Sequence, residues 1–329
     1  MTNCKLFITS RPTVLRATPV LAPVFVTVAA FTAGCTGDPG PDPDLVTPEV
    51  LAEEHAEWRA NRHRSLTNPA AGVISWAGLW ALAEGPNRFG SDPSLAIVLP
   101  PEDAPPFAGT LHLENGEVRL VPEAESGLTL DVASAVTEEL PLRSDRQDNT
   151  TILALGSLGL RIHSERGTDR LWLRVWDRDA PRLAAFQLPD YFPVSTDWRL
   201  PARFDPYPEP RIVPLADVRG GTVENESPGE LVFEVGDREH RLVAFARATS
   251  SSYFISLWDS TAVSDTYQGG RYMRVPRAND QGWTVIDFNR AYNPPCVFTP
   301  FSVCSLPPRD NRLQVAVTAG EKRPAEPAY

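Results

Sequence analysis

The sequence predicts a mainly β protein with two antiparallel β-sandwich or barrel domains and one N-terminal helix. Proline accounts for 33 of the 329 residues, about twice its usual share, and proline interrupts helices and central strands. Short apolar or alternating segments follow one another between turn signals, as in sandwiches and barrels. No strand leads into a glycine-rich helix start, which argues against dinucleotide-binding and P-loop folds.

Residues 1–34 have the features of an export signal. Three basic residues precede an apolar stretch from Val20 to Ala30, and small residues lead up to Cys35. A cysteine directly after Ala-Gly resembles the bacterial lipobox, although Thr32 stands where leucine is usual. The sequence therefore favours a lipoprotein of the cell envelope, attached to a bacterial membrane through Cys35. A secreted or periplasmic form is the alternative, because an uncleaved anchor needs a longer apolar run.

A tether and a helix are expected next. Residues 35–47 are rich in proline, glycine and aspartate and predict an extended tether. Thr47-Pro48-Glu49 combines an N-cap, a proline at the first helical position and an acidic first turn. We expect a helix over residues 48–66. Four of its residues share one face: Leu51, His55, Trp58 and Arg62.

Residues 70–180 are expected to form the first β domain. Its strand segments are Val73–Leu82, Ala96–Leu99, Thr110–Leu113, Val118–Val121, Leu128–Val132, Thr151–Leu155, Leu158–His163 and Leu171–Val175. An ordered, aromatic-rich connector over 181–210 leads to a second β domain over 211–323, and 324–329 is a tail. The later strand segments are Arg211–Pro214, Arg219–Val223, Glu230–Val235, Arg241–Arg247, Tyr253–Trp258, Arg271–Val275, Trp283–Asp287 and Leu313–Val317.

Charge and residue usage exclude several functions. The net charge of −11 and the pI near 5.0 argue against a nucleic-acid partner, which requires a basic face. Lysine occurs only at positions 5 and 322, so the folded body offers no Schiff-base or P-loop lysine. The histidines are scattered and form no metal motif; they are His55, His63, His112, His163 and His240. We expect no cofactor and no metal.

Cys296 and Cys304 are the cysteines left after the signal and the lipid site. In an exported chain, such a pair first suggests a disulfide. Free thiols and a metal site are the alternatives, and the spacing of the pair is not one used by zinc.

Several segments together resemble a bacterial and archaeal family known as domain of unknown function 1684. The longest matching run is Asp287 to Cys296, and the resemblance spans residues 53–323. The other matching segments are Glu57–Arg59, Asn87–Pro93, Leu173–Asp177, Asp190–Pro193, Thr266–Tyr267, Gly270–Arg271, Cys304–Pro308 and Ala319–Lys322. This family implies no activity.

Residues 86–165 also resemble a forkhead-associated β-sandwich, through Phe89–Pro100 and Leu155–Leu158. Ser91 replaces the arginine with which such domains bind phosphothreonine, so the resemblance implies a fold without that function.

The strongest candidate site is the loop that follows the strand 283–287. If the strand continues to Asn289, Asp287 and Asn289 fall on one face at its end, and five prolines stiffen residues 294–308. The candidate ligand-binding residues are Tyr267, Arg271, Asp287, Asn289 and Asn293. The leading hypothesis is a binding or scaffold module for a small molecule or an envelope protein, with the membrane reached only through the lipid. The alternative is a hydrolase or another acid–base enzyme that uses Asp287, Tyr292 and Glu321. Turn capping by Asp and Asn is the structural explanation of the same pattern.

Overall fold

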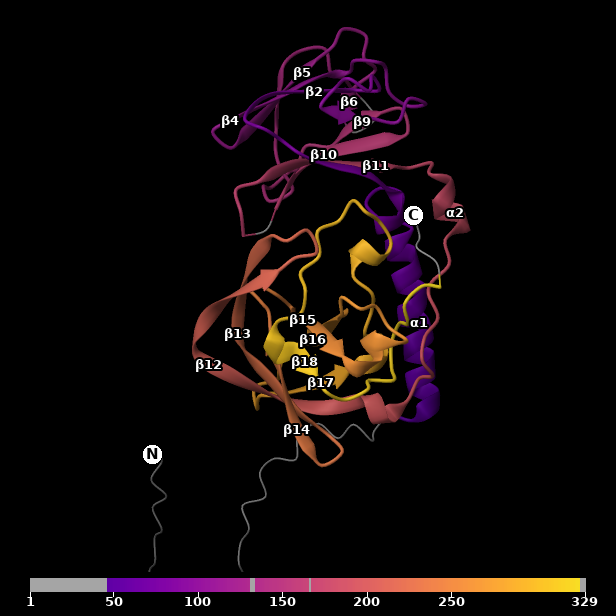
Figure 1. Ribbon diagram of the computed structural model, residues 1–329, viewed down its shortest axis with the longest axis vertical. Helices are drawn as coiled ribbons and strands as arrows, with labels where there is room; N and C mark the ends of the chain where they lie inside the picture. The colour runs from indigo at the N-terminus through magenta and orange to yellow at the C-terminus, as the bar shows by residue number, and fades with distance from the viewer. Residues whose placement is uncertain (1–45, 131–133, 166, 326–329) are drawn as a thin grey trace, which may run out of the picture. The chain divides into compact units, whose positions relative to one another are not determined.

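A computed structural model describes residues 46–130, 134–165 and 167–325 (Figure 1). The predicted export signal, Cys35 and most of the tether and tail lie outside these residues. Helix α1 spans Pro48–Leu66, and the Thr47 hydroxyl accepts a hydrogen bond from the Val50 N–H, as the cap predicts. Within the described residues, no helix is both long and apolar enough to cross a bilayer.

Two sheets form the N-terminal half and enclose one core. The six-stranded sheet has the order β1-β11-β10-β9-β6-β7, with β1 Trp76–Ala81, β11 Leu171–Asp177, β10 Leu158–Ser164, β9 Leu153–Leu155, β6 Thr129–Leu130 and β7 Ser134–Ala135. The five-stranded sheet has the order β3-β2-β4-β5-β8, with β3 Ile97–Val98, β2 Gly85–Gly90, β4 Gly109–Glu114, β5 Glu117–Pro122 and β8 Leu140–Leu142. Apolar side chains of both sheets, such as Phe89 and Val175, are fully buried together.

Two further sheets form the C-terminal half and enclose a second core. One sheet has the order β14-β13-β12-β17, with β14 Arg238–Ala244, β13 Thr222–Val235, β12 Arg199–Ala216 and β17 Trp283–Asp287. The other has the order β16-β15-β18, with β16 Arg271–Pro276, β15 Ser252–Asp259 and β18 Arg312–Leu313. Their shared core includes Leu231, Ile255 and Phe288. The mainly β fold class with an N-terminal helix is therefore confirmed.

Several details differ from the sequence expectation: β2 and β8 were not expected, and two expected strands form the single strand β13. Strand β12 begins at Arg199, inside the segment expected to be a connector. Two of its prolines, Pro208 and Pro210, lie where the pairing with β13 is interrupted between Pro206 and Arg211, so their missing N–H groups break no ladder there. Residues 314–317 are not strand, and the short β18 pairs in parallel with β15. The remainder of the connector holds a short helix α2 (Pro181–Ala185) and a 3₁₀ turn at 196–198.

Short 3₁₀ turns and bridges join the last part of the chain to both sheets. The turns are Val73–Ser75, Ser260–Val263, Phe288–Arg290, Pro295–Val297 and Arg309–Asn311. Isolated bridges pair Tyr272 with Tyr292 and Tyr191 with Glu321. The segment after β17 therefore lies against β16 and against Glu321, whose N–H donates to the Ala291 carbonyl at 2.8 Å, and its residues Phe288 and Ala291 belong to the C-terminal core.

Gly320 lies in close contact with the segment after β17. Its φ is +80°, and a Cβ atom there would lie 2.5 Å from the Ala291 carbonyl oxygen. Gly236 has a φ of +60° but has no atom near the same position. We expect Gly320→Ala to lower the free energy of unfolding by about 1–3 kcal/mol more than Gly236→Ala, because only the first substitution adds an overpacking clash. Urea unfolding of both variants measures the difference, and equal losses would contradict the close contact.

Candidate functional site

Asp287 and Asn289 meet at the end of β17, but not through strand alternation: β17 ends at Asp287, and Asn289 lies in the 3₁₀ turn Phe288–Arg290 that Asp287 caps. One Asp287 carboxylate oxygen accepts hydrogen bonds from the Asn289 backbone N–H at 3.1 Å and from its amide at 2.9 Å. The other lies 3.4 Å from the Arg199 guanidinium and 3.2 Å from that of Arg290. The Asn289 amide also exchanges hydrogen bonds with the backbone of Ser195. Both side chains therefore cap a turn and fix a neighbouring segment.

Glu321 has a fully buried side chain that joins three segments. Its carboxylate accepts hydrogen bonds from the Arg62 guanidinium at 3.0 Å, the Tyr191 hydroxyl at 2.8 Å and the Asn293 N–H at 2.7 Å. Burial, together with the charge of Glu321, raises the pKa of Tyr191 above its ordinary value. We call Arg62, Tyr191, Asn293 and Glu321 the Glu321 cluster. It anchors the loop after β17 to helix α1.

Arg271 is also buried, and its contacts join separate segments of the chain. Its guanidinium pairs with Asp259 at 2.7 Å and donates to the carbonyls of Val317, Ala319 and Glu321. The pair holds the C-terminal segment against β15 and β16. Tyr267 is half-buried, and the Cys296 thiol lies 3.9 Å from its hydroxyl.

The remaining candidates also lie within packed structure. Tyr292 lies under the guanidinium of Arg62, 4.5 Å from it, and burial raises the pKa of its hydroxyl. The Asn293 amide donates to the Lys322 carbonyl, while its oxygen has no hydrogen-bond partner in the described residues. Asp287, Tyr292 and Glu321 line none of four cavities found among the described residues, which have volumes of about 610, 710, 580 and 470 Å³. The sequence-derived candidates gather in space, but their contacts are structural.

Cys296 and Cys304 are free cysteines in the structure, so the expected disulfide is not formed in it. The Cys296 N–H nevertheless donates to the Cys304 sulfur at 3.1 Å. The hydrogen bond between the two thiols lowers the pKa of Cys304 and raises that of Cys296, which makes Cys304 the more acidic thiol. The disulfide stays a prediction for the exported chain.

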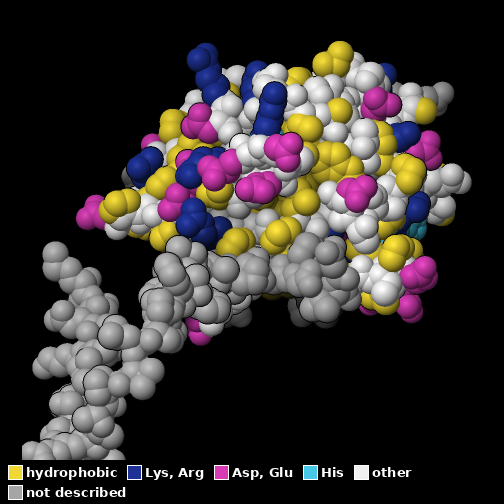
Figure 2. Space-filling model, turned by 90° about the horizontal axis from the view of Figure 1, so that it is seen from below, with side chains coloured by type: hydrophobic (Ala, Val, Ile, Leu, Met, Phe, Trp, Pro, Cys, Tyr) yellow, Lys and Arg dark blue, Asp and Glu magenta, His cyan; other side chains and the backbone are white. Residues whose placement is uncertain are grey.

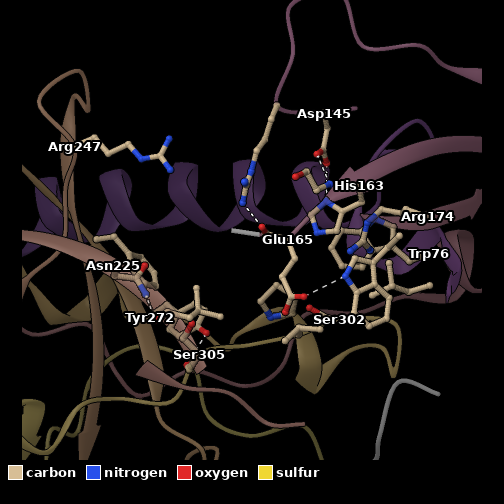
Figure 3. A pocket seen from close by; sticks show the side chains of 18 residues that line it. Trp76, Asp145, His163, Glu165, Arg174, Asn225, Arg247, Tyr272, Ser302 and Ser305 are labelled. Carbon is tan, nitrogen blue, oxygen red and sulfur yellow. Dashed lines mark hydrogen bonds and ion pairs between the residues drawn. The ribbon is translucent and has the colours of Figure 1, made fainter. Parts of the chain in front are cut away.

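A cavity of about 610 Å³ lies beside this loop (Figure 3). One wall comes from β1, β10, β11 and the segments that adjoin β10. The other comes from β13, the segment between β14 and β15, β15, β16 and residues 295–305. The first wall consists of Trp76, Leu79, Asp145, Arg146, His163, Ser164, Glu165, Trp172 and Arg174, and the second of Val223, Asn225, Arg247, Phe254, Tyr272, Pro295, Ser302, Val303 and Ser305. We refer to this space as the cleft.

Arg174 is the most unusual residue of the cleft. It lies in the centre of the buried strand β11 and is only 4% exposed. Its guanidinium stacks 3.8 Å from the centroid of the Trp76 ring and donates to the Phe301 carbonyl at 3.1 Å. Burial, followed by the charge of Arg161, lowers the pKa of Arg174 to about 10. The hydrogen bond from Arg174 to the Phe301 carbonyl also joins the N-terminal sheet directly to the loop after β17.

His163 and the two cleft carboxylates already have partners (Figure 3). The His163 imidazole lies 2.6 Å from Asp145, which also accepts the Ser164 N–H at 2.9 Å. Burial alone would raise the pKa of Asp145, but the two hydrogen bonds and the charges of His163 and Arg161 together lower it. Glu165 accepts the Trp172 indole N–H at 3.2 Å. Both carboxylates are thus fixed in the wall of the cleft.

The sequence analysis missed the cleft residues, although one signal was available. Strand β11 reads Leu-Trp-Leu-Arg-Val-Trp, and an arginine inside a fully apolar run requires an explanation. His163, one of the scattered histidines, lies in the cleft beside Asp145. The Asp177 carboxylate caps a turn by accepting the Asp179 N–H at 2.9 Å. Among the described residues, no three His, Cys, Asp or Glu side chains are placed to hold a metal ion.

One protein-family model matches the C-terminal part of the chain. The model of a family described as "Protein of unknown function (DUF1684)" matches residues 184–322. An uncharacterised protein of Haloarcula marismortui, solved by solution NMR, is similar at 32% identity with a TM-score of 0.36. The match covers 42% of this chain and 78% of that chain. No curated protein matches. The resemblance to a forkhead-associated domain stays a prediction.

His55 provides a pH test of how α1 is attached to the loop. Its ring lies 2.8 Å from the Asn289 carbonyl, and burial lowers its pKa below the ordinary 6.5. The unfolded chain then binds the proton more readily, so this contribution to stability is present above pH 6.5 and is lost as the pH falls through the lowered pKa. We expect His55→Gln to flatten the pH dependence of the unfolding free energy below pH 6.5. His112→Gln is the control for loss of an imidazole, and an unchanged slope in His55→Gln would contradict the assignment.

Proposed function

We propose that this protein, whose residues 184–322 belong to the DUF1684 family of unknown function, is a binding module for a small molecule. The observation that carries this proposal is the cleft. Its volume of about 610 Å³ falls in the range of small-molecule sites, about 300–1,000 Å³. Residues 295–305 supply part of its wall, so the loop singled out by the sequence frames the site from one side.

The wall of the cleft is pre-formed in the described residues. The Tyr272 hydroxyl donates to the Ser305 carbonyl at 2.8 Å, and Arg174 holds Phe301. The Glu321 cluster fixes Asn293 at the start of the same loop. A site with a fixed wall loses less conformational entropy when it binds a ligand. This rigidity favours binding, whereas the alternative hydrolase residues Asp287, Tyr292 and Glu321 are engaged in structural contacts.

A cavity-filling variant tests the proposal. Val303 lines the cleft, whereas Val263 is 77% exposed and does not line it. A panel of small polar and aromatic compounds, screened by thermal shift, is expected to stabilise the wild type and Val263→Trp but not Val303→Trp. A ligand at one hundred times its dissociation constant adds about 2.7 kcal/mol of stability. Stabilisation that Val303→Trp retains in full, or a panel without any binder, would contradict the proposal.

We also propose that the protein is exported and attached to a bacterial membrane by lipid on Cys35. The basic, apolar and small-residue order of residues 1–35 supports this. The acidic chain would be repelled by anionic headgroups, so the lipid and not the protein surface would hold it there. The partner would then be a molecule of the envelope or a small solute within it.

Expression in a bacterial host tests the attachment. The wild type is expected in the membrane fraction with a diacylglyceryl mass on Cys35, and globomycin should block its processing. Cys35→Ser should lose the lipid mass and leave the membrane fraction. Detection of an unmodified Cys35 in the processed wild type would refute lipid attachment.

A further inference from the structure

We propose that the ligand of the cleft is a small organic anion, a carboxylate or a phosphate, whose charged group is bound by Arg174 and attracted by Arg247. This inference rests on the proposed function and names the chemical class that the same cleft accepts. The argument uses the charges of the cleft, their partners and their burial.

Arg174 lacks the partner that a buried guanidinium normally has. Its Nη1 reaches the Phe301 carbonyl, but its Nε is buried without an acceptor. Within the described residues, no carboxylate oxygen lies within 4.0 Å of its guanidinium, and the ion pairs found there involve other arginines. The charge of Asp145 acts on Arg174 only from beyond ion-pair distance. A buried cation without an anion is costly. An anionic ligand in the cleft would supply the missing charge.

The other charges of the cleft leave a positive excess. Asp145 is hydrogen-bonded to His163 and lies 3.7 Å from Arg161, and Glu165 interacts with Trp172 and Arg170. Arg146 donates only to backbone carbonyls of Glu165 and Thr168. Neither carboxylate of the cleft is therefore an ion-pair partner of the three arginines that line it, Arg146, Arg174 and Arg247.

Arg247 lies on the opposite side of the cleft. It is exposed, and its guanidinium makes no hydrogen bond or ion pair with any described residue. In Figure 3 its side chain extends from the side opposite Arg174, and His163 and Glu165 lie between the two arginines in this view. Two cations in the walls of one cleft raise the local concentration of anions.

The positive cleft contrasts with the rest of the protein. The chain carries a net charge of −11, and on the face shown in Figure 2 acidic and basic side chains are interspersed. The rings of Trp76 and Trp172 supply apolar surface beside the cations. This combination matches a ligand with an anionic group attached to a flat apolar part.

Isothermal titration calorimetry of the purified full-length protein tests the inference. The probes are benzoate and phenyl phosphate, which distinguish a carboxylate from a phosphate, and benzyl alcohol as the neutral analogue. We expect at least one anion to bind at least tenfold more tightly than benzyl alcohol, with affinity falling as sodium chloride is raised. Arg174→Met should weaken the anion by about tenfold to a hundredfold, the range for a charge-assisted hydrogen bond.

Two variants control the test. Arg247→Met removes an exposed cation of the cleft without disturbing a packed group, so it keeps the test valid if Arg174→Met does not fold. Arg247→Met should lower the affinity for the anion and reduce the salt dependence of binding. Arg238→Met removes an exposed arginine on β14 outside the cleft and should change neither. Equal binding of benzyl alcohol and the anions, blocked by Val303→Trp, would overturn the anion inference and leave the binding module intact. Absence of binding by any probe would overturn the anion inference, and the compound panel alone would then decide the proposed function.

Discussion

The buried carboxylate of Glu321 is the interaction on which the arrangement of the C-terminal half depends. It receives hydrogen bonds from helix α1, from the connector and from the loop after β17, through Arg62, Tyr191 and Asn293. A buried charge is tolerated only where its partners satisfy it. The three segments must therefore come together for any one of them to be stable. Because of this constraint, a proline-rich loop can serve as a fixed wall.

The cleft follows from this constraint in two steps. The Glu321 cluster fixes the start of the loop, and Arg174 then reaches from β11 to the Phe301 carbonyl and ties the loop to the N-terminal sheet. Placing a guanidinium in an apolar strand is costly in itself, and one backbone carbonyl does not neutralise its charge. The structure therefore contains a local electrostatic deficit beside a ligand-sized cavity. Binding of an anion would relieve that deficit.

Local rules were sufficient for much of the fold and for little of the site. The Thr47 cap depends only on neighbours in sequence, and it occurs as expected. Strand β12 was expected to begin later, because its prolines argue against a strand unless the pairing is known to be interrupted. Asp287 and Asn289 did meet, but whether such residues bind a ligand or cap a turn depends on contacts with Ser195 and Arg199, about 90 residues away in sequence. The cleft itself joins segments from residue 76 to residue 305, which no local pattern reveals.

A crystal structure of the protein with bound phenyl phosphate is the most direct test of this account. We predict that the phosphate oxygens lie within hydrogen-bond distance of the Arg174 guanidinium, with the phenyl ring between the wall of β1 and β11 and residues 295–305. A phosphate bound elsewhere, or a cleft closed by side chains with Arg174 paired to a carboxylate of the chain, would contradict it.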